Sequence, residues 1–152
     1  MDRRFRPVLA TAVVSLLLGC APSQESGGGR DATLVAGRWY SVEQVQKGSR
    51  VFQDQCAQCH GVQAQGITAD WRMRLEDGSF PPPPLNGSAH AWHHPLSVLL
   101  QVINQGGVPL GGQMPAFANR ISDKEKLAAI AYFQSFWNDD LYGNWEEMGG
   151  TE

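Results

Sequence analysis

The sequence predicts an all-α fold, and three observations support this class. Apolar residues recur at helical spacing in three separate stretches, which begin near residues 41, 95 and 122. Two of these stretches open with the Ser-x-x-Glu/Gln pattern that caps helix N-termini. No stretch shows the apolar–polar alternation typical of a half-buried strand. We therefore expect helices joined by loops and no sheet.

The first helix is expected to begin at Ser41, because Ser41 and Gln44 can form a capping box. Val45, Gly48 and Phe52 then fall on one face at helical spacing, and the helix should run on into the segment that begins at residue 56.

The middle helix should start at Pro95, since proline suits a first helical position, and should end at Gly106-Gly107. A second capping box, Ser122 with Glu125, should open the last helix. Residues 80–85 contain four consecutive prolines and are expected to be loop. The apolar residues expected on the two helices are Leu96, Leu99, Leu100 and Ile103, then Leu127, Ile130, Ala131, Phe133, Phe136 and Trp137.

Residues 56–60 read Cys-Ala-Gln-Cys-His, the C-x-x-C-H pattern that attaches a c-type haem. Thiols at this spacing can add to the two vinyl groups of one porphyrin edge, and the adjacent His60 can bind the iron. A thiol redox pair would need a βαβ context, and a zinc site would need about four ligands, neither of which the sequence offers. The single motif predicts one covalent haem c on Cys56 and Cys59.

The N-terminus has the features of a secretion signal. Arg3, Arg4 and Arg6 precede an apolar run over residues 7–18, which is too short to span a bilayer. The remaining cysteine, Cys20, ends a Leu-Leu-Gly-Cys sequence that resembles a bacterial lipobox. We expect residues 1–19 to be a lipoprotein signal peptide and Cys20 to be lipidated. Ordinary cleavage with an unused cysteine is the alternative.

Residues 20–38 are polar and Gly-rich, which indicates a flexible linker. The linker would tether a folded domain, residues 39–138, to the cell envelope on its periplasmic side. Ala21 after the cysteine favours an outer over an inner membrane by resemblance to known sorting rules. Without residues 1–19, nine basic and fourteen acidic residues remain, a formal charge of −5. This charge argues against nucleic acid and favours neutral or basic protein partners.

In its order of parts, the chain resembles a class I, monohaem c-type cytochrome of the bacterial lipoprotein type. The order is a helix leading into C-x-x-C-H, a Pro-rich loop, a middle helix, a Met loop and a last helix, over residues 41–138. The resemblance implies a small helical domain that encloses its haem. It also implies that Gly48 and Phe52 pack against aromatic residues of the last helix, namely Tyr132, Phe133 or Trp137.

The resemblance further implies an axial ligand and a supporting contact. Met114, in Gly-Gly-Gln-Met-Pro, matches the family's axial-Met loop and would bind the iron opposite His60. A His/Met pair raises the reduction potential relative to two imidazoles. Pro83 matches the residue whose carbonyl accepts a hydrogen bond from the axial histidine ring, although the four prolines leave the register uncertain by one.

Two segments have no counterpart in the family pattern. His90, His93 and His94 form a cluster that could bind copper or zinc, or could be a polar turn. Residues 139–152 are an acidic, aromatic C-terminal tail that could dock on a partner, wrap around the domain or fray.

The function expected is one-electron transfer between redox partner proteins rather than enzymatic catalysis, because two axial ligands leave the iron no open position. The alternatives are a haem-based ligand sensor or peroxidase-like enzyme with a displaceable Met114, and metal handling through the histidine cluster.

Overall fold

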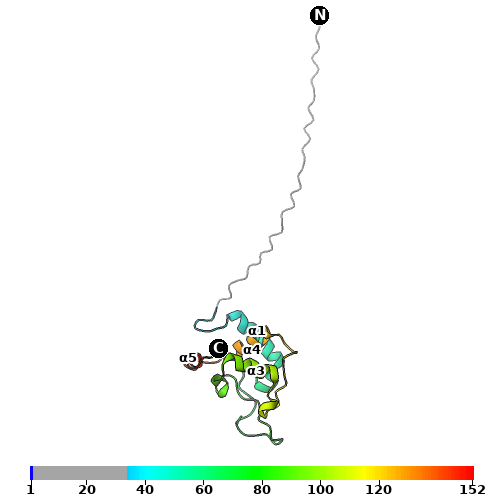
Figure 1. Cartoon of the computed structure of the whole chain (residues 1–152). Helices are drawn as coiled ribbons and strands as arrows, with labels where there is room; N and C mark the ends of the chain where they lie inside the picture. Colours follow the sequence, from blue (N-terminus) through cyan, green and yellow to red (C-terminus); the bar gives the residue numbers. More distant parts are fainter. Residues whose placement is uncertain (2–33) are drawn as a thin grey trace. The chain divides into compact units, whose positions relative to one another are not determined.

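A computed structural model describes Met1 and residues 34–152 of the 152-residue chain. The part described is all-α, as the sequence predicts, with helices joined by loops and two short 3₁₀ turns (Figure 1). Within it there is no strand, only two isolated bridges that pair Leu34 with Ser41 and Phe80 with Gly112. The elements are α1 (Val42–Gln55), α2 (Ala57–His60), η1 (His90–His93), α3 (Leu96–Gln105), η2 (Val108–Leu110), α4 (Asp123–Gln134) and α5 (Asp139–Glu147).

Both predicted capping boxes are present. Ser41 is the N-cap of α1, where its hydroxyl accepts from the Gln44 N–H at 3.1 Å while Gln44 Oε1 accepts from the Ser41 N–H at 2.8 Å. Ser122 and Glu125 make the reciprocal pair at the start of α4. Each box satisfies backbone donors that a helix start leaves unpaired, which explains why these two helices begin where the sequence predicts.

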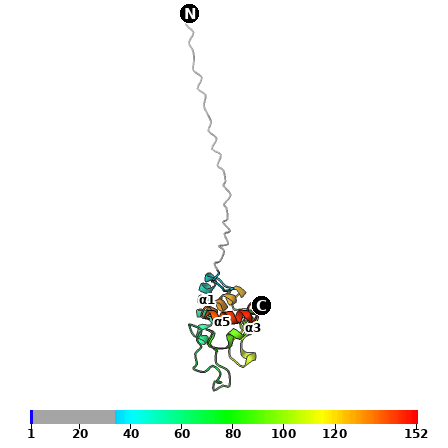
Figure 2. The same ribbon diagram turned by 90° about the vertical axis from the view of Figure 1, so that its left-hand side faces the viewer.

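The main packing contact is between α1 and α4, which lie side by side (Figures 1 and 2). Gly48 lies at their closest approach, where a Cβ would lie 1.8 Å from the Ala128 carbonyl oxygen. One turn along, the rings of Phe52 and Tyr132 meet with centroids 5.2 Å apart. The predicted pairing of a small residue and an aromatic on α1 with an aromatic of α4 is therefore confirmed, with Tyr132 as the partner.

The folded part extends beyond residue 138, where the sequence analysis set the end of the domain. Residues 139–147 form α5, capped by Asn138, and Tyr142 and Trp145 are 2% and 1% exposed. The indole Nε1–H of Trp145 donates to the His94 carbonyl at 2.8 Å. The sequence left open whether this segment docks on a partner, wraps around the domain or frays. In the structure it packs on the domain.

The N-terminal edge of the described part is held by the same helix. Arg38 lies 3.9 Å from the ring centroid of Tyr142, and its Nη2 donates to Asp139 Oδ1 at 2.7 Å. The Trp39 N–H donates to the Tyr142 hydroxyl oxygen at 3.0 Å. These contacts hold Arg38 and Trp39 against the first turns of α5.

Candidate functional site

The Cys-x-x-Cys-His segment follows directly on α1. Cys56 is the C-cap of α1, and the single turn of α2 then carries the chain through Cys59 to His60. The N–H groups of Cys59 and His60 both donate to the Cys56 carbonyl, at 3.1 and 2.9 Å. Residues three apart on a helical turn share a face, so the turn keeps the two thiols on one side.

Both thiols are free, and their environment differs from that of a thiol redox pair. Burial, reinforced by the neighbouring Cys59, raises the pKa of Cys56 to about 11. Reactive redox cysteines instead have lowered pKa values, because the thiolate is the nucleophile. The raised pKa disfavours the thiolate of Cys56, and with it attack by Cys56 on a disulfide, and is compatible with a cysteine that serves as an attachment point.

His60 is 7% exposed, and its ring is fixed by the proline loop. Its Nδ1 lies 2.9 Å from the Pro83 carbonyl oxygen. Because a carbonyl can only accept, the ring proton belongs on Nδ1, and Nε2 keeps the lone pair that a metal requires. Burial lowers the pKa of His60, opposed in part by this hydrogen bond, so the neutral, ligating imidazole is favoured. Among the four consecutive prolines, Pro83 is the one whose carbonyl makes this contact.

The proline loop is held in place from two sides. The N–H groups of Leu85 and Asn86 both donate to the Ala64 carbonyl, at 2.7 and 3.1 Å, and the Trp137 indole donates to the Leu85 carbonyl at 2.8 Å. At its other end, the Phe80 N–H donates to the Gly111 carbonyl at 2.8 Å. The loop that orients His60 is thus joined directly to the segment that leads to the predicted axial methionine.

Two glycines position the methionine loop. The Gly107 N–H donates to the Met114 carbonyl at 2.9 Å. Gly106 has φ +80°, and a Cβ there would lie 2.6 Å from that same oxygen. Sequence reasoning used this Gly-Gly pair only as a helix stop. One glycine is enough to end a helix, so the second glycine, Gly107, indicated that the backbone there lies close to another segment.

The remaining methionines of the described part are more exposed than Met114, which is half-buried. Met73 and Met148 are 68% and 54% exposed. The structure thus brings Cys56, Cys59, His60 and Pro83 together and links the Met114 loop to the same proline segment.

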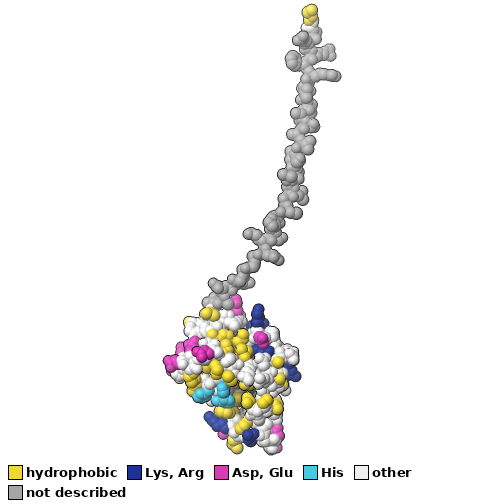
Figure 3. Space-filling model, in the orientation of Figure 1, with side chains coloured by type: hydrophobic (Ala, Val, Ile, Leu, Met, Phe, Trp, Pro, Cys, Tyr) yellow, Lys and Arg dark blue, Asp and Glu magenta, His cyan; other side chains and the backbone are white. Residues whose placement is uncertain are grey.

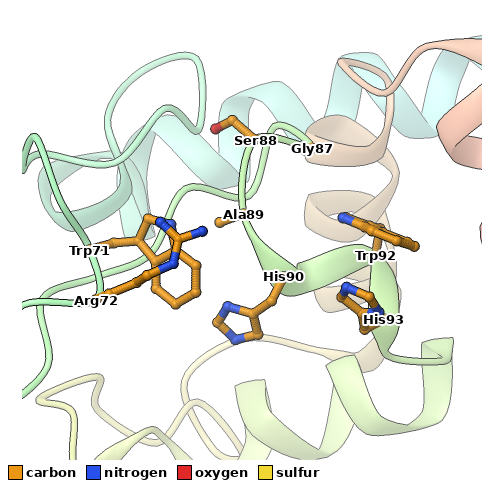
Figure 4. A pocket seen from close by; sticks show the side chains of 8 residues that line it. All are labelled: Trp71, Arg72, Gly87, Ser88, Ala89, His90, Trp92 and His93. Carbon is orange, nitrogen blue, oxygen red and sulfur yellow. The ribbon is translucent and has the colours of Figure 1, made fainter.

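The histidine cluster does not form a metal-binding arrangement. His93 stacks on Trp92 with ring centroids 3.7 Å apart (Figure 4). The rings of His90 and His94 meet edge-to-face at 5.6 Å. In the part of the chain that the structure describes, no three His, Cys, Asp or Glu side chains are grouped so that they could hold a metal ion. The copper- or zinc-binding interpretation therefore has no geometric support.

The predicted lipidation site, Cys20, and the signal peptide lie outside the described residues. Among the described helices, none combines the length and apolarity needed to cross a membrane.

The arrangement suits a covalent haem. It offers two unpaired thiols on one helical turn, an adjacent buried imidazole whose Nδ1 proton is fixed, and a glycine-supported methionine loop. A comparison with protein families agrees: the model described as cytochrome c oxidase, cbb3-type, subunit III, matches residues 43–133. No curated protein and no solved structure matches the chain.

Proposed function

Since this chain belongs to the family described as cytochrome c oxidase, cbb3-type, subunit III, we propose that it is a one-electron carrier with a single covalent haem c. The family assignment makes it a c-type cytochrome that takes part in haem-based electron transfer. The observation that carries the more specific proposal is the hydrogen bond of 2.9 Å between His60 Nδ1 and the Pro83 carbonyl, next to the two free thiols.

Each residue of the site has a separate role in this proposal. The thiols of Cys56 and Cys59 would hold the haem as thioethers, each sulfur bonding to one carbon of a vinyl group whose other carbon takes the thiol proton. His60 would bind the iron through Nε2, and Pro83 would fix the plane of that imidazole. Met114 would supply a thioether sulfur as the second protein ligand. When bound, the haem iron provides the one-electron couple between its ferric and ferrous forms.

The choice of ligands limits the chemistry to electron transfer. A methionine sulfur stabilises ferrous iron relative to a second imidazole and so raises the reduction potential. With His60 and Met114 both bound to the iron, small molecules would have no open coordination position. The redox partners would bind weakly, as electron-transfer encounters bury small interfaces.

We also propose that the domain is tethered to the bacterial cell envelope, facing the periplasm, by acyl chains on Cys20. The support is the signal-like sequence before this cysteine and the Gly-rich linker after it. Cys20→Ser should release a soluble form that keeps its haem. If fractionation finds this variant still fully bound to membranes, the lipid-anchor proposal is wrong.

The experiment that tests electron carriage is replacement of the axial methionine. In Met114→Ala, the loss of the sulfur donor should lower the reduction potential and open the iron to carbon monoxide, while the haem stays attached. The matched control is Met73→Ala, which removes the same side chain from a position that is 68% exposed.

The control should keep the potential of the parent protein and, like the parent, resist carbon monoxide. If the parent protein already binds carbon monoxide rapidly, and its potential does not change in Met114→Ala, then Met114 is not a ligand. The protein would then be a ligand-binding haem protein rather than a carrier.

A further inference from the structure

A hollow of about 280 Å³ opens on the domain surface between the loop at Trp71-Arg72 and the η1 turn (Figure 4). Its walls are formed by Trp71 and Arg72 on one side and by Ser88 and His90 on the other. From its charge, its donors and its geometry, we propose that this hollow is a carboxylate-binding site.

The titratable side chains that line the hollow are all basic. They are Arg72, His90 and His93, and no carboxylate is part of the lining. The sequence neighbour Asp70 approaches Arg72 Nη1 only at 3.9 Å, between side chains that are 48% and 70% exposed. A surface ion pair at this distance contributes little, so it leaves the guanidinium available to another anion. Arg72 thus gives the hollow a positive charge that no carboxylate of the lining neutralises, in a chain with a formal charge of −3.

Aromatic stacking orients the basic groups. The guanidinium carbon of Arg72 lies 4.6 Å from the ring centroid of Trp71, and the Trp71 and His90 rings lie 4.7 Å apart at 33°. Figure 4 shows the imidazole of His90 turned toward Trp71 and Arg72. A stacked guanidinium loses little freedom when it binds, and its planar array of donors matches the two oxygens of a carboxylate.

The charge state of His90 also bears on the site. Burial lowers the pKa of His90, and the neighbouring basic groups His94, His93 and Arg72 lower it further. The neutral imidazole is therefore favoured, and it can donate one ring N–H to an anion held by Arg72. Figure 3 shows histidine side chains together on one face of the domain, with Lys or Arg side chains below them and Asp or Glu side chains above.

A carboxylate could come from two sources. One is a propionate of the haem, a possibility that rests on the proposed function. The other is a small soluble carboxylic acid that enters from solvent. Both would place two oxygens against the Arg72 guanidinium, with ring N–H groups of the lining side chains as further donors.

The test is proton NMR on the reduced, diamagnetic protein as purified. If the source is the haem, nuclear Overhauser contacts should connect the ring protons of Trp71 or His90 with the propionate methylene protons, and added succinate should not change the Trp71 indole signal. If the source is soluble, succinate should shift that signal in a saturable way, with no propionate contacts. Either pattern supports a carboxylate site, and the absence of both overturns it.

Arg72→Gln tests the proposed recognition, and Arg50→Gln is the control, since it removes the same charge from an exposed position on α1. Loss of a charge-assisted hydrogen bond should weaken succinate binding roughly 10- to 100-fold, or abolish the ordered propionate contacts. Equal effects of both variants would overturn the assignment of Arg72.

Haem staining of the same sample distinguishes a failure of the proposed function from a failure of the proposed carboxylate site. An unstained protein would contradict the proposed function alone, because succinate titration of that protein still decides whether the hollow binds a carboxylate.

Discussion

Gly48 offers the sharpest structural prediction, because it lies where α1 and α4 cross. A methyl group added at this position would lie 1.8 Å from the Ala128 carbonyl oxygen, 2.5 Å from its carbonyl carbon and 3.0 Å from Tyr132 Cβ. Close contacts between carbon and a carbonyl oxygen are about 3.3–3.6 Å. In Gly48→Ala the two helices must therefore separate by more than an ångström.

This separation would loosen the contact between Phe52 and Tyr132, whose ring centroids are 5.2 Å apart. Overpacking of this kind costs about 1–3 kcal/mol. With a urea dependence of about 1–3 kcal/mol per M, the unfolding midpoint should fall by roughly 1 M. Circular dichroism of the purified protein in a urea series measures it.

The matched control is Gly143→Ala in the interior of α5. A Cβ at Gly143 has no atom within 4 Å, and its φ lies outside the left-handed region. Replacing a mid-helix glycine with alanine should stabilise the protein by roughly 0.5–1 kcal/mol. The two glycines should thus respond in opposite directions. If Gly48→Ala unfolds at the same urea concentration as the parent protein, the close helix crossing described above does not exist in solution.

Two further predictions concern the C-terminal helix and the second capping box. Trp145→Ala should destabilise the domain by roughly 3–5 kcal/mol, since the indole is 1% exposed and donates to the His94 carbonyl. If the variant unfolds at the same urea concentration as the parent protein, α5 is not part of the fold. The hydrogen bonds from Ser122 hold the pKa of Glu125 below its ordinary value of 4.5. Ionised Glu125 therefore stabilises the fold above pH 4.5. This contribution disappears as the pH falls through the lower pKa that Glu125 has in the folded protein. The difference in thermal stability between the parent protein and Glu125→Ala should accordingly shrink below pH 4.5 in a series of melting curves, and a constant difference would contradict the capping role of the carboxylate.

Local sequence signals predicted much of this fold. The capping boxes and the helical spacing placed α1, α3 and α4 because these features depend on residues three or four apart. The start of α3 is displaced by one residue, as Pro95 is the N-cap and not the first helical residue. The site residues at the Cys-x-x-Cys-His turn were identifiable for the same reason, since the motif is contiguous.

The packing of α5 could not be predicted in this way. Its residues include four carboxylates, and a nine-residue helix has little stability of its own. It is held by tertiary contacts, such as that between Trp145 and Trp137, whose ring centroids are 6.0 Å apart. The available clue was the spacing of Trp137, Leu141 and Trp145 at i, i+4 and i+8. The contact of Gly107 with Met114 joins a helix end to a loop seven residues later, and only the second glycine of the Gly-Gly pair indicated it.

Covalent attachment of a haem through Cys56 and Cys59 can be measured by mass spectrometry of the peptide containing residues 56–60, after the protein has been unfolded and extracted with acidified acetone. This peptide should carry the mass of one haem, and the same peptide of a Cys56→Ser, Cys59→Ser double variant should carry none. If the extraction removes all haem and the parent peptide has the mass of two unmodified cysteines, Cys56 and Cys59 do not hold a haem covalently.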